Sequence, residues 1–365
     1  MVAQGLLHTG LMWAIERLAG SYDVHAEEGS GLPRVRATAG SKFGILCYHR
    51  VGTQGVPLFS RLEPSAFAAQ MRYVKKHYRV VPLGQLCDEL QDCRRVPPTL
   101  AITFDDGYRD LYTHAFPVLQ KYQIPATIYL IGRCMESGEV PWYDRIFLAL
   151  KAAPGESLRV ELGSPREFRI SSPSARVSAA WEMVSYLRSV RDTRRQEWCA
   201  AFERQIPLPV EELEGRMLDW NQVGAMHRAG ISFGAHTMSH PVVSQLDPRG
   251  LEEELIVCKQ VLERGLGARV EHFAYPFGKP EDVSLAAKEI LRGAAYRSAV
   301  TTNEGFNTTG SDRLRLRRLQ IGEDTSLANF AFNVSRLFLE VSGDKCSVLH
   351  RSESLGRPGM EMRRF

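Results

Sequence analysis

Two acidic residues and two histidines each follow a short apolar run, the position at which parallel α/β proteins place their active sites. Asp105 and Asp106 come directly after the run at 100–104, and His236 and His240 come four residues apart after a second run. Alone, Asp-Asp-Gly often forms a turn or a helix cap, and isolated histidines most often serve structure. If both runs end at one sheet edge, an aspartate and both histidines form a metal set with open positions for water and substrate.

Two adjacent carboxylates can take unequal roles at such a site. One stays ionised by binding a divalent ion, and the other is free to act as a base on water at the metal. A zinc-like ion lowers the pKa of bound water to about 7 and polarises a carbonyl, so the predicted reaction is hydrolysis of an amide or ester. The sequence has no H-E-x-x-H, G-x-S-x-G or Walker phosphate loop, which excludes the commonest metalloprotease, serine-hydrolase and nucleotide-hydrolase classes.

The elements that must position these residues alternate along the chain. Short apolar runs predict buried strands at 43–48, 100–104, 126–131, 231–235, 272–275 and 295–300. Helical spacing lies between them, and two sets of apolar residues each form one helical stripe: Phe67, Met71 and Val74, and Leu251, Leu255, Cys258 and Leu262. Asp219 and Gln222 stand at capping-box spacing. This alternation predicts an α/β fold whose parallel sheet is either doubly wound or closed into a barrel.

Three segments depart from the alternation. Residues 135–215 predict a largely helical insertion, with a loop-like stretch at 154–173 followed by one long polar helix. Residues 1–42 predict an N-terminal extension with an amphipathic helix, which packs on the protein or, alternatively, contacts a membrane surface. Residues 342–365 predict a disordered basic tail.

Composition excludes several classes of protein. The 365 residues are 44% hydrophobic and 24% charged, which excludes wholesale disorder and a membrane bundle. A net charge of +4 is too small to indicate nucleic acid. Seven cysteines without a C-x-x-C pair indicate neither a disulfide framework nor a cysteine metal cluster. The first twenty residues resemble no signal peptide, so we expect a cytoplasmic protein, with the inner membrane surface as the alternative location.

The motifs TFDDG at 103–107 and HTMSH at 236–240 resemble those of the polysaccharide deacetylases, carbohydrate esterase family four, also called the NodB-homology domain. The resemblance covers about 43–335, and we assign 43–341 to the domain. It implies a distorted (β/α) barrel of the polysaccharide deacetylase type, with the helical insertion. It also implies an enzyme that uses a divalent metal, with zinc expected, to remove acetyl groups from N-acetylated sugars of a polysaccharide or its lipid-linked precursor.

The same resemblance assigns roles to residues. Asp105 would be the catalytic base, and the metal ligands would be Asp106, His236 and His240. The family's R-x-P-Y-type motif corresponds to 273–278, where Ala274 replaces the arginine. The backbone N–H of Phe277 could still donate to an oxyanion. Arg318 is a candidate replacement for the missing charge, although we favour a plain surface position for it.

The family's late Leu-x-His motif, which usually supplies the general acid, is absent. The segment Cys47–Val51 is similar to the YH-x-V segment of the subgroup with permuted motif order that includes poly-N-acetylglucosamine deacetylases. In that subgroup the histidine takes the acid role, which implies His49 here. The alternative for His49 is a structural cap on the first loop.

Substrate contacts are predicted around the mouth of the barrel. Trp142, Tyr143 and Asp144 follow the third strand, and Tyr275 and Arg318 complete the candidate set. Aromatic rings can stack on sugar faces, but the first two could equally anchor the insertion to the core. Two other functions stay open: a glycan-binding barrel that has lost catalysis, and a two-His, one-carboxylate Fe(II) enzyme. The sequence does not indicate an oligomeric state.

Overall fold

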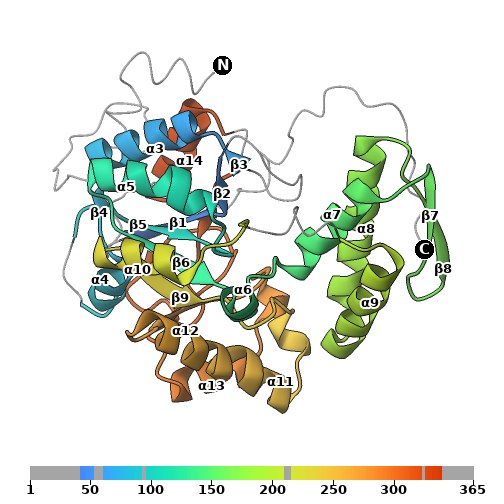
Figure 1. The fold of residues 1–365 in the computed structure, drawn as a ribbon. Helices are drawn as coiled ribbons and strands as arrows, with labels where there is room; N and C mark the ends of the chain where they lie inside the picture. Colours follow the sequence, from blue (N-terminus) through green and yellow to red (C-terminus); the bar gives the residue numbers. More distant parts are fainter. Residues whose placement is uncertain (1–41, 53–60, 93–95, 209–214, 323–324, 339–365) are drawn as a thin grey trace, which may run out of the picture.

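The computed structural model describes residues 42–52, 61–92, 96–208, 215–322 and 325–338 (Figure 1). The predicted amphipathic helix within 1–42 and the predicted tail at 342–365 lie outside this part of the chain. Within the described ranges, no helix is both long and apolar enough to cross a membrane.

One sheet of parallel strands forms the centre of the domain, in the order β11-β10-β9-β6-β5-β1, with the short β12 antiparallel to β1. These strands are β1 (Lys42–Tyr48), β5 (Thr99–Phe104), β6 (Ala126–Leu130), β9 (Ser232–Ala235), β10 (His272–Ala274), β11 (Ser298–Val300) and β12 (Asn307–Thr308). Shorter strands are β2 (Arg50–Val51), β3 (Arg61–Leu62), β4 (Arg79–Val80) and β13 (Leu319–Gln320).

The predicted strands are confirmed because each apolar run is buried on both faces of the sheet. Every residue of β1, β5 and β6 is buried. The largest difference between a predicted and an observed strand boundary is at β11, which begins at Ser298 rather than at the predicted Ala295. Ala295 instead adopts a left-handed conformation, with φ of 58°, in the turn that precedes the strand.

The sheet curls so that its two ends approach each other. Leu316 forms a parallel bridge with Val300 of β11, and Leu319 of β13 pairs in parallel with Leu46 of β1. The segment 316–320 therefore spans the space between the first and last parallel strands. This geometry confirms the predicted distorted barrel.

Helices surround the curled sheet (Figure 1). They are α3 (Pro64–His77), α4 (Leu83–Glu89), α5 (Phe116–Tyr122), α10 (Trp220–Arg228), α11 (Pro248–Glu252), α12 (Cys258–Leu266), α13 (Leu285–Gly293) and α14 (Leu327–Arg336). Two π-helical segments, η1 (Leu111–Ala115) and η4 (Glu253–Val257), join their neighbours into longer helices. The predicted capping box is present at α10, where Asp219 accepts from the backbone N–H of Gln222 at 2.8 Å.

Residues 142–205 build a second lobe beside the sheet, and the short helix α6 (Gly132–Ser137), which packs near α12, leads into it (Figure 1). The lobe contains α7 (Trp142–Ala152), β7 (Ser157–Glu161), β8 (Pro165–Arg169), α8 (Pro173–Ser189) and α9 (Asp192–Gln205). These elements share a hydrophobic cluster that is separate from the main core.

Two expectations for this lobe are wrong. The stretch 154–173 is not a loop but contains the antiparallel hairpin β7–β8. Only Val160 and Phe168 of its two strands are buried, so the polar outer residues hide the strand pattern in the sequence. The single long helix is two helices, because Val190 and Arg191 adopt extended backbone conformations between α8 and α9.

Candidate active site

The Asp-Asp pair lies at the carboxyl end of β5. The backbone N–H of Asp105 donates to the carbonyl of Tyr48 at 2.9 Å, which holds the turn against β1. Asp106 adopts a left-handed conformation with φ of 71°, and Gly107 follows with φ of 81°. Both carboxylates are almost fully buried. The strand end therefore presents two adjacent acidic groups to the mouth of the barrel.

The two histidines follow β9 at the same edge. The Nε2 atoms of His236 and His240 lie 3.5 and 3.6 Å from Oδ1 of Asp106. His236 Nδ1 is 2.8 Å from the carbonyl of Ala274, so this nitrogen carries the hydrogen and Nε2 presents a lone pair. Burial lowers the pKa of His236 to about 4, which keeps its ring neutral. One-turn spacing and the sheet edge thus bring the predicted residues together.

These three residues fit a divalent metal ion. Their candidate ligand atoms all lie within 4.8 Å of one another. Within the described part of the chain, Oδ2 of Asp106 and Nδ1 of His240 are buried without a hydrogen-bond partner. Burial and neighbouring Asp105 raise the pKa of Asp106, a cost that a cation would offset. The donor set of two imidazoles and one carboxylate is typical of zinc and of other transition metals.

A buried glutamate supports the loop between the two histidines. Glu254 of η4 accepts hydrogen bonds from the backbone N–H groups of Met238 and Ser239 at 2.7 and 2.9 Å and from the Ser239 hydroxyl at 2.7 Å. Glu254 was not predicted as a site residue from the sequence. The sequence feature that could have identified it is its position: Glu254 is a charged residue three positions after Leu251, on the apolar stripe of a predicted helix.

Arg318 binds the carboxylate of Asp105 through two hydrogen bonds of 2.7 Å each. It also donates to the carbonyl of Thr301 at 2.8 Å, and its side chain is fully buried. The favoured surface position for Arg318 is therefore wrong, because segment 316–320 closes the sheet and turns this side chain inward. Burial alone would raise the pKa of Asp105, but Arg318 outweighs burial and holds the pKa well below its usual range.

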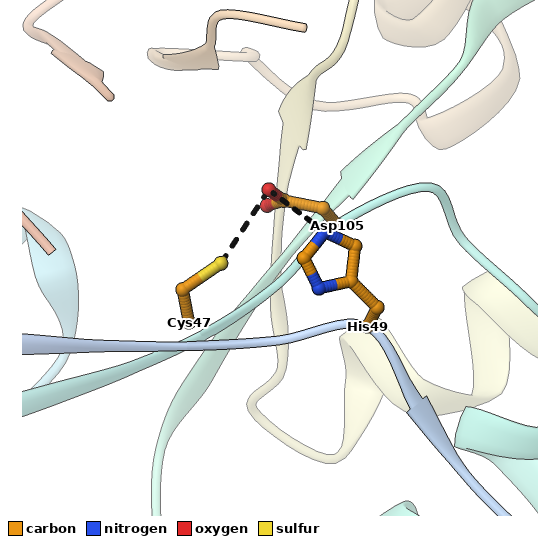
Figure 2. A group of neighbouring side chains, drawn as sticks. All are labelled: Cys47, His49 and Asp105. Carbon is orange, nitrogen blue, oxygen red and sulfur yellow. Dashed lines mark hydrogen bonds and ion pairs between the residues drawn. The ribbon is translucent and has the colours of Figure 1, made fainter. Parts of the chain in front are cut away.

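Cys47 and His49 both lie beside the carboxylate of Asp105, as Figure 2 shows. The Cys47 Sγ atom is 3.6 Å and the His49 Nε2 atom is 3.9 Å from Oδ2 of Asp105. The three side chains are close enough to hold a second ion, but Arg318 already binds both oxygens of Asp105 and would repel a cation. Burial also raises the pKa of the Cys47 thiol and lowers that of His49. We therefore interpret this group as a hydrogen-bonding set around Asp105.

A cavity of about 310 Å³ opens onto the site. The cavity is lined by the five predicted catalytic and metal-binding side chains, by Tyr143 and Phe277, and by one face of α8. The full set of lining residues is His49, Asp105, Asp106, Tyr143, Trp181, Val184, Ser185, Arg188, His236, His240, Phe277, Thr302, Gln320, Ile321 and Gly322. Phe277 has a left-handed φ of 59°. Among the described residues, its backbone N–H has no hydrogen-bond acceptor.

The predicted substrate contacts divide into two groups. Tyr143 lines the cavity and donates its hydroxyl hydrogen to Oδ1 of Asp106 at 2.9 Å. Trp142 instead donates from Nε1 to the carbonyl of His240 at 3.1 Å, which anchors the second lobe to the histidine loop.

The other three predicted contacts do not reach this cavity. Asp144 is buried outside it, where burial raises its pKa to about 6. Tyr275 is fully buried and donates its hydroxyl hydrogen to the carbonyl of Leu314 at 3.1 Å. The guanidinium of Arg318 donates hydrogen bonds to Asp105 and to the backbone carbonyl of Thr301. Of these three residues only Tyr275 directly follows a strand, because Asp144 lies within α7 and Arg318 precedes β13. The direction of their side chains could not be predicted from the sequence.

Left-handed backbone conformations concentrate at the site. Six described residues other than glycine have a positive φ, and four of them belong to the site: Asp106, Thr237, His240 and Phe277. Such conformations cost about 1 kcal/mol or more each in residues that have a Cβ atom. Their clustering indicates that packing elsewhere maintains a strained arrangement of the ligand loops.

The curled sheet and the polar cluster at its carboxyl edge define an α/β enzyme with a candidate metal centre. A family model described as polysaccharide deacetylase matches residues 94–296. The chain therefore belongs to the polysaccharide deacetylase family, as the motifs predicted, and polysaccharide deacetylation is its class of activity.

Individual relatives agree with this assignment. YxkH of Bacillus subtilis (strain 168) is 21% identical over 292 residues, which cover 80% of this chain and 75% of the relative. The poly-beta-1,6-N-acetyl-D-glucosamine N-deacetylase of Escherichia coli (strain K12) is 28% identical over 98 residues, 26% of this chain and 15% of that protein. The Streptococcus pyogenes deacetylase PplD, solved with acetate, shares the fold with a TM-score of 0.56 at 20% identity, covering 81% of this chain and 99% of that one.

Proposed function

We propose that this protein hydrolyses the acetamide of N-acetylated sugar units in a polysaccharide or its lipid-linked precursor, releasing acetate and a free amine. One observation carries the proposal. Asp106, His236 and His240, which could hold a metal ion, line the same cavity as the separate, ionised carboxylate of Asp105. The similarity to an enzyme named for N-deacetylation of poly-beta-1,6-N-acetyl-D-glucosamine supports this choice of substrate class.

Asp106, His236 and His240 would hold a divalent ion, with zinc the expected one. When bound, such an ion supplies Lewis acidity, which polarises the acetyl carbonyl and acidifies water. Tyr143 fixes Asp106 through its hydroxyl, and the carbonyl of Ala274 fixes the ring of His236. These contacts prepare the ligands in advance of binding.

Asp105 would act as the base. Arg318 keeps it ionised and fixes its plane, so it can take a proton from the water that attacks the acetyl carbon. His49 would then protonate the amine nitrogen as the C–N bond breaks. Because His49 lies 3.9 Å from Asp105, the proton taken from water can pass to the histidine, which need not be charged in the resting enzyme.

The Phe277 backbone N–H would donate to the oxygen that becomes negative as water adds to the carbonyl. Phe277 lines the cavity, and its left-handed φ sets the direction of its backbone amide. A backbone donor of this kind does not depend on the side chain, so Ala274 does not remove it. We place the reaction in the cytoplasm or at the inner membrane surface, where a lipid-linked sugar would be met.

Acetate release tests this proposal. Purified protein is incubated with the monomer and the tetramer of N-acetylglucosamine and with a lipid-linked N-acetylated sugar, before and after treatment with a chelator. We expect acetate from at least one substrate, loss of activity on metal removal and recovery on addition of Zn²⁺. A protein that binds these sugars and releases no acetate in any metal state would instead be a glycan-binding barrel.

A further inference from the structure

Helix α8 of the second lobe forms one wall of the active-site cavity. Trp181, Val184, Ser185 and Arg188 all line the cavity together with the metal-type ligands. Their spacing of three, four and seven residues places them on one face of the helix. None of these four side chains has a role in the proposed chemistry.

Trp181 is unusual among the large apolar side chains of the cavity because 43% of its surface is exposed. Its ring contacts Phe147 of α7 at right angles, with 5.7 Å between ring centroids, so its position is supported from within the lobe. An aromatic ring that is held on one side and open on another beside a polar site is suited to stacking against the apolar face of a sugar. The predicted stacking residue Trp142, by contrast, is buried.

Arg188 connects this wall to the reaction centre. Its guanidinium lies 3.9 Å from the ring centroid of Phe277, and its Nε is buried without a hydrogen-bond partner among the described residues. Seven residues separate Trp181 from Arg188, which is about 10 Å along a helix axis. This length exceeds that of one sugar ring. The α8 face can therefore contact a second sugar, next to the one that lies at Asp106, His236 and His240.

We propose that Trp181 is the stacking platform for the sugar unit next to the one that loses its acetyl group. The substrate is then an oligomer or polymer rather than a free monosaccharide, and Trp181 is a specificity-determining residue. This inference rests on the proposed function, because it assumes that an N-acetylated sugar occupies the cavity.

The test compares the tetramer and the monomer of N-acetylglucosamine. In Trp181→Ala, kcat/KM for acetate release from the tetramer should fall about tenfold, mainly through KM, while the value for the monomer stays near wild type. Trp181→Phe keeps an aromatic ring and should recover most of the loss. Phe332→Ala removes a ring of similar exposure, 39%, from α14, which lies outside the cavity. This control variant should leave kcat/KM unchanged for both substrates.

Binding separates failure of this inference from failure of the proposed function. Calorimetry with the tetramer should show a Kd about tenfold higher for Trp181→Ala than for wild type, whether or not acetate is released. Wild-type protein that binds the tetramer without releasing acetate would overturn the proposed function alone. Equal losses on both substrates, no loss in Trp181→Ala, or no binding of the tetramer would overturn the stacking platform.

Discussion

At the scale of single residues, the Asp105–Arg318 pair distinguishes this site. The position that carries the family's arginine is Ala274, and the charge comes instead from a residue 213 positions away from Asp105. Both partners are buried and bonded through two hydrogen bonds. Removing one partner of a buried ion pair typically costs 3–5 kcal/mol, about the price of an uncompensated charge.

Arg318→Met should therefore destabilise the protein by about 3–5 kcal/mol and raise the pKa of Asp105. The folded-state pKa of Asp105 is depressed in wild type, so its stabilising contribution is present above the unfolded value and lost as the pH falls. In the variant, the acid limb of acetate release should move to higher pH. Urea unfolding and a pH–rate profile measure the two effects.

Arg318→Lys keeps a positive charge and serves as the matched control. It should recover part of the stability and return the acid limb toward wild type, although a lysine cannot form the paired hydrogen bonds. An acid limb at the same pH in Arg318→Met and wild type would show that Arg318 does not set the ionisation of the base.

The sequence predicted the residues of local motifs but not the contacts that distant residues make with them. Asp106, His236 and His240 were predictable because their spacing and strand-end positions are local properties. Arg318 was named as a candidate for the missing charge but was expected at the surface, since only closure of the sheet by 316–320 brings it to Asp105. Tyr275 was expected to contact substrate because it follows a strand, but side-chain direction at a strand end depends on packing.

At the scale of elements, the helix that follows the histidine loop supports the candidate metal centre. α11, η4 and α12 form one helical run, and the apolar stripe predicted for it is buried. Glu254 interrupts this stripe and caps the backbone of the loop instead of packing against the core. Partners that orient metal ligands in this way commonly change metal affinity by 10–100-fold when they are replaced, so we expect about that range here.

Glu254→Gln should weaken Zn²⁺ binding about tenfold or more. The amide keeps the size of the side chain but replaces one accepting oxygen with a donor, which faces the loop N–H groups or the Ser239 hydroxyl. Competition with a chromophoric chelator measures the affinity without any turnover.

Glu253→Gln changes the neighbouring glutamate, which is exposed. It removes the same charge from the same helix and should leave Zn²⁺ affinity unchanged. Equal affinities in the two variants would mean that Glu254 does not position the loop.

At the scale of the whole molecule, the barrel buries histidines that must stay neutral. His272 of β10 lies outside the site, is 6% exposed and has its Nδ1 atom 2.9 Å from the Ser298 hydroxyl. Burial lowers its pKa to about 4. The unfolded chain then binds a proton more readily than the folded chain between about pH 6.5 and 4. The folded state therefore loses stability as the pH falls through this range.

This linkage predicts that His272 accounts for about 2 kcal/mol of lost unfolding free energy between pH 8 and pH 5. His272→Asn keeps a partner for Ser298 and cannot titrate in this range, so its free energy of unfolding should fall less steeply on acidification. Urea denaturation at both pH values checks this. A wild-type slope in His272→Asn would contradict the prediction.

We propose that Asp105, as the base, hydrolyses a sugar acetamide together with a metal ion held by Asp106, His236 and His240. The most direct measurement is acetate release, with metal content determined on the same samples, for wild type and Asp105→Asn. We predict that wild type releases acetate only with metal bound, and that Asp105→Asn retains the metal but loses activity about 10³-fold. Full activity in metal-free wild type, or in Asp105→Asn, would overturn the proposed mechanism.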